Sequence, residues 1–373
     1  MEGQREWIRV RESIPGNFVS LTTAAAQLYP DEVRLDAAGM LAQPGWMLEA
    51  PIDLSAVDVV FDEDCPPAAL DGSGEVTSHV RPSPSKVSRY SEAIRDLAPP
   101  QLFENRPCWR LADARFTTSA ATLSFSTTSY FDAVDICGAV AHEFAAAHLL
   151  NQDRTTPPSW RRLRFREAIG NPFGFGHRPA VMSVNTLTIR RDKDSATILL
   201  HNRDAANVAT SGGVIGVMPA GVFQPSSAHH NHHSADFDLW HNIMREYSEE
   251  FLGNPEPDGA DYTTEPLRSL EEARRSGGIR VHCFGLAMGA LDLWPELETV
   301  AVFDAEVFDE LFAGLVSRND EGSAVRVGTT LPTVHIPLTR DVIDDLWATG
   351  RLAPQTLLCL NAAWKHRDQL FVR

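Results

Sequence analysis

Residues 245–253 have the sequence REYSEEFLG, and they indicate an amphipathic helix that ends near Gly253. On an α-helix each residue advances about 100°, so Glu246, Glu249 and Glu250, at positions i, i+3 and i+4, share one face. The opposite face is apolar and is made by Trp240, Ile243, Met244, Tyr247 and Phe251. The pattern predicts a helix over residues 236–252 that is buried on one side and acidic on the other.

The acidic face carries like charges that repel one another unless a cation neutralises them. Clustered carboxylate oxygens are the ligands that hard divalent ions such as Mg²⁺ and Mn²⁺ prefer. Arg245 comes one helical turn before Glu249, so we expect an ion pair that fixes this carboxylate. The alternative is a solvated acidic face of the kind that many surface helices have.

The same residues resemble the core of the Nudix box, in which a glycine loop precedes a helix carrying Arg-Glu, a bulky apolar residue, any residue and Glu-Glu. Residues 245–250 match this pattern position by position, and MPAG at residues 218–221 is similar to the family's Pro-Gly-Gly loop. The resemblance covers about residues 178–310 as a domain. It implies a catalytic, metal-binding cluster of Glu246, Glu249 and Glu250, with Arg245 as the catalytic-site residue that orients it.

Three features depart from the family pattern. The segment before Arg245 is longer than in the family, and we expect residues 225–235 to form an inserted loop. The glutamate that the family carries ahead of the arginine falls on Phe237, although Asp236 directly precedes it. Gly253 comes one residue late, at a helix end where glycine is expected anyway. The second departure keeps a non-catalytic interpretation open.

The whole chain also resembles uncharacterised actinobacterial two-domain proteins, a likeness that supplies no chemistry.

The composition of the 373-residue chain is that of a soluble globular protein long enough for two domains. We expect it to be cytoplasmic, because no apolar run approaches the roughly 18 residues that cross a bilayer and the polar N-terminus lacks a signal-peptide pattern. The five cysteines lie far apart without CxxC spacing, which favours reduced thiols. The net charge of −17 makes duplex nucleic acid a poor partner, whereas a local metal ion would still allow a small phosphorylated ligand.

The first part of the chain predicts an α/β domain of unknown role over residues 1–175. Residues 57–61 have the pattern of a strand, residues 65–86 that of a long surface loop, and residues 132–150 that of a strong helix. Breaks flank the basic segment at residues 160–166, and we place the domain boundary between these breaks, near residue 175. We expect this domain to border the ligand cleft, because clefts between domains are frequent ligand sites.

Strands alternate with helices over residues 176–373. A hairpin is expected from residues 181–190 and 196–201, and a later strand from residues 279–288. The tail over residues 339–364 is predicted to be largely helical. The predicted fold class is α/β (α+β): a Nudix-like α/β/α sandwich, preceded by a separate α/β domain and followed by a helical C-terminal extension.

Further candidates lie around the motif. Those expected to contact the substrate are Gly221, Phe223 and Glu296. Nudix enzymes commonly take an additional metal ligand or base from a downstream loop, and Glu298 and Glu306 are alternatives to Glu296 for that role. Residues 229–233, HHNHH, offer histidine pairs that bind transition metals in other proteins, but an exposed polar loop is the simpler interpretation. A gating role for this loop beside the site also stays open.

These features predict metal-dependent hydrolysis of a diphosphate linkage in a nucleoside diphosphate derivative or related small molecule, with Mg²⁺ or Mn²⁺ as cofactor. A glutamate would act as general base. The alternative is a non-catalytic protein that senses a nucleotide in a Nudix-like pocket, and isomerase or transferase chemistry on a diphosphate is a third class. The expected partner is a small phosphorylated ligand and neither duplex nucleic acid nor a membrane, while a homodimer is compatible with the sequence.

Overall fold

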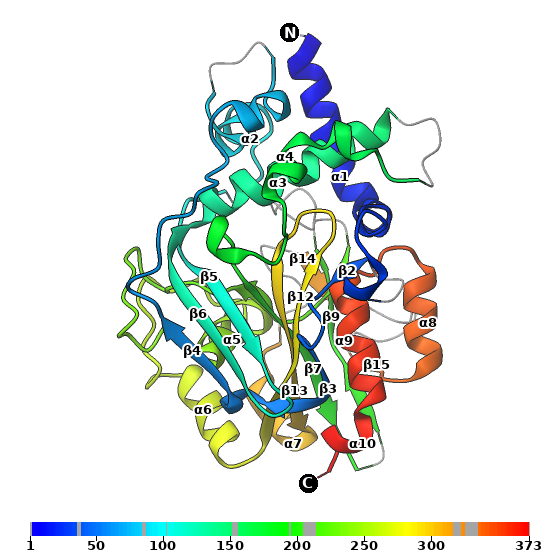
Figure 1. Ribbon diagram of the computed structural model, residues 1–373. Helices are drawn as coiled ribbons and strands as arrows, with labels where there is room; N and C mark the ends of the chain where they lie inside the picture. Colours follow the sequence, from blue (N-terminus) through cyan, green and yellow to red (C-terminus); the bar gives the residue numbers. More distant parts are fainter. Residues whose placement is uncertain are drawn as a thin grey trace.

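The computed structural model describes residues 2–35, 39–83, 87–101, 103–150, 156–193, 195–203, 214–315, 322–324 and 335–372. It shows a mixed α/β protein with a large curled mixed sheet and helices around it (Figure 1). The main path of this nine-stranded sheet runs through β1 (Arg34–Leu35), β2 (Met40–Leu41), β12 (Ile279–Gly289), β13 (Pro295–Asp304), β7 (Ser183–Arg191), β8 (Ala196–Ile198) and β15 (Ile336–Pro337). Two further strands join it at the sides: β3 (Met47–Asp53) pairs with β12, and β11 (Ala220–Val222) pairs with β7.

The centre of the sheet consists of β12, β13 and β7, which are buried on both faces over most of their length. β12 and β13 are antiparallel, whereas β13 and β7 are parallel. Alternate residues of β13 enter different apolar clusters: Leu297 packs in the cluster that contains Tyr247, and Val300 packs in the one that contains Leu358. Because both faces are covered, even the threonines Thr186, Thr188 and Thr299 of β7 and β13 are buried.

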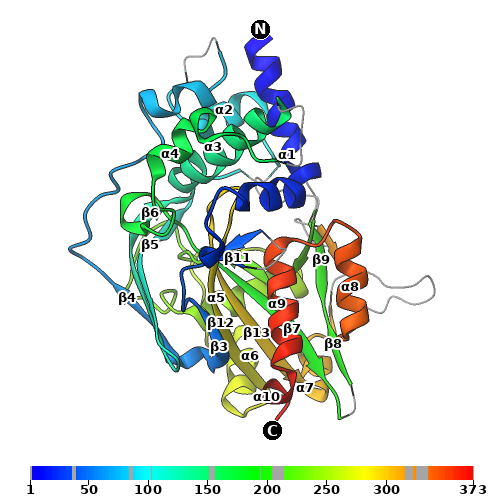
Figure 2. The ribbon, with the colours of Figure 1, turned by 45° about the vertical axis from the view of Figure 1, so that its right-hand side comes forward.

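Two three-stranded sheets and the helices complete the structure. One sheet is formed by β10 (Ile215–Val217), β9 (Leu200–Arg203) and β14 (Gly322–Ala324), and the other by β4 (Val57–Phe61), β6 (Ala121–Ser129) and β5 (Pro107–Phe116). Four helices gather at the top of the molecule in Figures 1 and 2, namely α1 (Glu2–Ala26), α2 (Tyr90–Leu97), α3 (Tyr130–Leu149) and α4 (Arg164–Ile169). At the opposite end lie α6 (Leu267–Arg275), α7 (Ala305–Leu311) and α10 (Arg367–Leu370).

The C-terminal helices cover one face of the large sheet. α9 (Pro354–Lys365) contacts β7, β12 and β13, and α8 (Arg340–Ala348) packs beside α9 (Figure 2). Short 3₁₀ turns connect elements elsewhere, namely η1 (Asp31–Val33), η3 (Leu54–Ala56), η4 (Glu75–Val80), η5 (Trp160–Arg162) and η6 (Phe175–His177). Among the described residues, no helix combines the length and the apolar character that crossing a membrane requires.

Several sequence predictions are confirmed in this architecture. The mixed α/β class is correct, the predicted hairpin is β7 and β8, the strong helix is α3, and the helical tail contains α8 and α9. The sheet itself joins the two parts of the chain, because β2 and β3 pair with β12. Strands from the first part of the chain thus belong to the large sheet, and the division near residue 175 stays a prediction about folding units.

Two buried arginines also connect the two parts of the chain, at the turn between β12 and β13. Arg166 donates hydrogen bonds to the carbonyl oxygens of Ala290, at 2.7 Å, and Leu291. Arg178, which follows the boundary near residue 175, donates to the carbonyl oxygen of Leu293 at 2.7 Å and to that of Pro172, in the first part, at 3.3 Å. Arg166, in the basic segment at residues 160–166, thus serves as a contact between the two parts.

The carboxyl group of Asp292 in this turn should make stability depend on pH. Burial raises the pKa of Asp292 to about 6, against the opposing effects of Trp294 N–H, Arg166 and Arg178. The folded chain therefore binds the proton more tightly than the unfolded chain, whose aspartate titrates near 4, and stability falls as the pH rises from about 4 to about 6. Asp292→Asn should remove this loss, which amounts to about 3 kcal/mol above pH 6. Urea unfolding of both proteins between pH 4 and pH 7 measures it, and parallel curves would contradict the assignment.

Candidate functional site

The acidic motif lies where the type of helix changes. α5 (Leu239–Glu246) is capped by Asp238, whose side chain accepts a hydrogen bond from His241 N at 2.9 Å. The helix then continues into a π-helical turn, η7 (Tyr247–Phe251). The prediction of one regular α-helix is wrong in this turn, because i→i+5 bonding rotates the residues after Glu246 away from their α-helical positions.

Aromatic packing holds this turn against the large sheet. The ring of Tyr247 lies 5.4 Å from that of Phe303, and the ring of Phe251 lies 4.8 Å from that of Phe312. The hydroxyl groups of Tyr247 and Thr188 form a hydrogen bond of 2.8 Å. The predicted apolar face is confirmed in full, since all of its members are buried: Trp240, Ile243, Met244, Tyr247 and Phe251.

Glu246 at the end of α5 lies directly against Gly221 of β11. A Cβ atom added to Gly221 would sit 1.9 Å from Oε1 and 2.0 Å from Cδ of Glu246. Glycine is thus required at this position for the carboxylate to approach the strand so closely. The structure therefore brings together the glycine loop and the first glutamate of the motif.

Glu250 approaches the same strand from η7. Its Oε1 accepts a hydrogen bond from Ala220 N at 3.0 Å, and its Oε2 lies 4.0 Å from Nδ1 of His201 on β9. Glu250 and His201 are both buried. Glu246 and Glu250 therefore contact consecutive residues of β11, where a strand edge, the π turn and the second sheet meet.

Glu249 is half-buried beside them, and its electrostatic environment is strongly unfavourable for a negative charge. Burial, then the carboxylates of Glu246 and Glu256, raise the pKa of Glu249 to about 10, with Arg245 acting in the opposite direction. The three motif carboxylates are near enough to interact but not drawn to a single point. Among the described residues, three ligand atoms lie within 4.8 Å of one another only in the group Glu63, His232 and His233.

Arg245 is buried and has a different ion-pair partner from the one predicted. Its guanidinium lies 3.2 Å from Oδ1 of Asp236 and also donates to Asn242 Oδ1, at 3.0 Å, and Gln224 O, at 2.7 Å. Asp236 is itself buried. The predicted pair with Glu249 is therefore replaced by a pair with Asp236, the acid next to the position where the Nudix pattern has its glutamate.

The other predicted contacts lie in different places. Phe223 is fully buried, with its ring 5.0 Å from that of Phe125, so its side chain packs in the core and has no surface for a ligand. Glu296 is half-buried on β13. By alternation along the strand it projects to the same face as Glu298, which bonds to Asn185 and Cys359 on the side covered by α9.

Sequence reasoning missed a further acid and a basic residue at the site. Glu256 accepts a hydrogen bond from Gln224 Nε2 at 3.1 Å and forms an ion pair with Arg106. Burial raises the pKa of Glu256, while Arg106 and Arg245 lower it. Arg106 comes from the first part of the chain, which therefore borders the carboxylate cluster. The sequence does show Glu256 as an acidic residue in the polar segment after Gly253. No local pattern, however, indicates that it pairs with Arg106.

Gly221→Ala should perturb the cluster while leaving the fold intact. The added methyl group would meet only the far end of the flexible Glu246 side chain, so the carboxylate must move away from β11. We expect a change in stability of about 1 kcal/mol or less and a weakening of Mn²⁺ binding by about tenfold. Calorimetric Mn²⁺ titration measures the effect. Gly314→Ala is the control, since its added Cβ has no neighbour within 4 Å. Equal Mn²⁺ affinities in the two variants would show that the contact between Gly221 and Glu246 does not contribute to cation binding.

No protein-family model matches this chain, and a search of curated proteins finds no similar sequence.

Proposed function

We propose that the glutamates of α5 and η7 bind a divalent cation and that the protein hydrolyses a diphosphate linkage in a nucleoside diphosphate derivative or related small molecule. One observation carries the proposal: Glu246 and Glu250 contact consecutive residues of β11, and Glu249 lies beside them. This juxtaposition joins the glycine loop and the acidic helix that resemble the two parts of a Nudix box.

The donor set fits the implied metal. Carboxylate oxygens are hard ligands, which suits Mg²⁺ or Mn²⁺ better than softer transition metals. Burial and neighbouring carboxylates make the charge of Glu249 costly, as its pKa of about 10 reflects. A cation held by Glu246, Glu249 and Glu250 would relieve that repulsion. When bound, such an ion supplies Lewis-acid polarisation of phosphoryl oxygens.

In this proposal the side chains have separate roles in catalysis and in positioning. A glutamate of the cluster would accept the proton of the attacking water, whose oxygen bonds to one phosphorus while the bridging oxygen leaves with the other. Arg245 is a positioning residue, because its hydrogen bonds to Asp236, Asn242 and Gln224 fix the end of α5 against the loop after β11. With a net charge of −17, binding of a small phosphorylated ligand depends on such a local cation.

A non-catalytic nucleotide sensor is the second candidate. The spread of the carboxylates favours it, since Glu250 already accepts a hydrogen bond from Ala220 N and the three acids do not converge within 4.8 Å. A pocket that binds a phosphorylated ligand without bringing a water into line would give affinity without turnover.

A substrate screen distinguishes these functions. Nucleotide sugars, dinucleotides and nucleoside triphosphates are incubated with the full chain and millimolar Mn²⁺, and released phosphate is read after phosphatase treatment. We expect Mn²⁺-dependent release from at least one diphosphate-containing class. Ligand-dependent thermal stabilisation without release would select the sensor, whereas neither binding nor release in any class would contradict both functions.

A further inference from the structure

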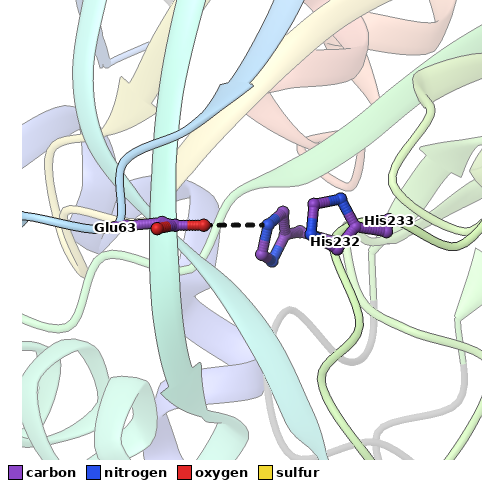
Figure 3. Close-up of side chains that lie close together, drawn as sticks. All are labelled: Glu63, His232 and His233. Carbon is purple, nitrogen blue, oxygen red and sulfur yellow. Dashed lines mark ion pairs between the residues drawn. The ribbon is translucent and has the colours of Figure 1, made fainter.

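A second group of potential metal ligands, which contains none of the motif glutamates, lies at the surface. Glu63 follows β4, while His232 and His233 belong to the loop between β11 and α5. One ligand atom from each of the three residues lies within 4.8 Å of the others. Nε2 of His232 is 3.6 Å from Oε1 of Glu63. In Figure 3 the ring of His232 points toward the Glu63 carboxylate, with His233 next to it.

Packing fixes the position of the central ligand. The ring of His232 stacks on that of Phe61 at 3.9 Å between centroids, with an angle of 4° between the planes. The ring of His233 lies 4.0 Å from that of His232, and its backbone N–H donates to Asn231 Oδ1 at 3.1 Å. The imidazole of His232 is thus held against the end of β4, two residues before Glu63.

A second histidine anchors the same loop to the neighbouring strands. Nε2 of His230 lies 3.0 Å from the carbonyl oxygen of Cys108 on β5 and 2.9 Å from that of Thr128 on β6. This position leaves His230 engaged with backbone atoms rather than with the Glu63 group. The hydrogen bonds of His230 therefore hold the loop in place beside Glu63.

We propose that Glu63, His232 and His233 bind a transition-metal ion of the Zn²⁺ class. Two imidazole nitrogens and one carboxylate oxygen form the borderline donor set that Zn²⁺ takes, unlike the all-oxygen set of the motif glutamates. Ligand atoms of a tetrahedral Zn²⁺ site lie about 3.4 Å apart, close to the separation between His232 and Glu63. Their exposure on the surface lets the ion enter and leaves a coordination position for water.

The ion would clamp the inserted loop onto β4. Residues 225–235 are otherwise connected to the first part of the chain through His230 and through the stack of His232 on Phe61. Soon after His233, the chain reaches Asp236, the buried partner of Arg245. Zn²⁺ at the surface would therefore order the segment that enters the Asp236–Arg245 pair, without taking part in chemistry at the motif.

Calorimetric titration of the full chain with Zn²⁺ tests the site, with the absorption spectrum of bound Co²⁺ as a second readout. We expect one equivalent to bind, and both His232→Ala and His233→Ala to weaken binding by at least about tenfold. Glu63→Gln should weaken it as well. His229→Ala changes an exposed histidine of the same loop and should bind as the wild type does. Circular dichroism confirms that each variant is folded.

Two results would overturn the proposal. One is Zn²⁺ affinity in His232→Ala and His233→Ala equal to that of the wild type. The other is loss of Zn²⁺ binding in Glu249→Gln, which would place the ion at the motif instead. Hydrogen exchange tests the clamp: amides of residues 225–235 should exchange more slowly with Zn²⁺ in the wild type and not in His232→Ala. Unchanged exchange in the wild type would refute the clamp.

Discussion

Glu249→Gln should abolish the stabilisation that millimolar Mn²⁺ gives to the wild-type chain and should lower turnover by roughly 100-fold or more. The substitution replaces the carboxyl group with a neutral amide of nearly the same volume, which cannot become the anionic ligand that a divalent cation requires. If the carboxylates hold a cation that binds only the folded state, losing one of them removes the increase in stability by mass action. Thermal melts of both proteins with and without Mn²⁺, followed by the phosphate-release assay, measure the two effects.

The matched control for this experiment is Glu310→Gln, at an exposed glutamate on α7. It makes the same chemical change away from the motif and should respond to Mn²⁺ as the wild type does. If the acidic face were only solvated surface, Glu249→Gln would change stability by no more than about 0.5 kcal/mol and leave every ligand effect unaltered. Identical Mn²⁺ responses in wild type and Glu249→Gln would exclude Glu249 as a ligand.

Arg245→Met should lower the free energy of unfolding by about 3–5 kcal/mol, because it leaves the buried Asp236 carboxylate without its cationic partner. The Arg245 side chain is 4% exposed and the Asp236 side chain 9%, so water does not replace the lost contact. The carbonyl oxygen of Gln224 and Oδ1 of Asn242 lose a donor at the same time. Urea denaturation measures the loss.

Two comparisons sharpen this result. Arg161→Met, at an exposed arginine, should stay within about 0.5 kcal/mol of the wild type. Arg245→Met combined with Asp236→Leu removes both charges, and the double-mutant cycle should show a favourable coupling above about 1 kcal/mol. A loss below about 1 kcal/mol in Arg245→Met, or additive effects in the cycle, would contradict the assigned ion pair.

Local patterns in the sequence predict the elements that depend on local physics. The alternation in β7 and β8 and the alanine-rich run of α3 are sufficient to find these elements. The apolar face of the motif helix is correct because its periodicity is set by burial on one side. The close contact of Glu246 with Gly221 agrees with the expected meeting of helix and glycine loop, which came from the family resemblance.

What the sequence does not predict depends on distant contacts. The π turn after Glu246 is held by Phe303 and Phe312, which follow in β13 and after α7 and have no visible relation to the motif. Arg245 selects Asp236 over Glu249 because the loop after β11 brings that carboxylate into the interior. Spacing along one helix shows only which ion pairs are within reach of each other. The fold decides which of these pairs forms, by the carboxylate that it buries beside the arginine.

The strands of residues 34–53 illustrate the same limit at the level of the sheet. β1 and β2 are two residues long each, too short for any periodicity, and β3 pairs with β12, which belongs to the second part of the chain. Their place in the large sheet is decided by backbone hydrogen bonds across that separation. Breaks in the local sequence pattern near residue 175 do not show which distant strands pair, so they could not predict this sheet.

Anomalous diffraction from crystals soaked in Mn²⁺ tests the central claim most directly, because it locates the ion without reference to any substrate. We predict an anomalous peak bounded by the carboxylates of Glu246, Glu249 and Glu250 beside Gly221, and its absence in Glu249→Gln crystals. A wild-type map without a peak at these glutamates, or with manganese only at Glu63, His232 and His233, would contradict the account.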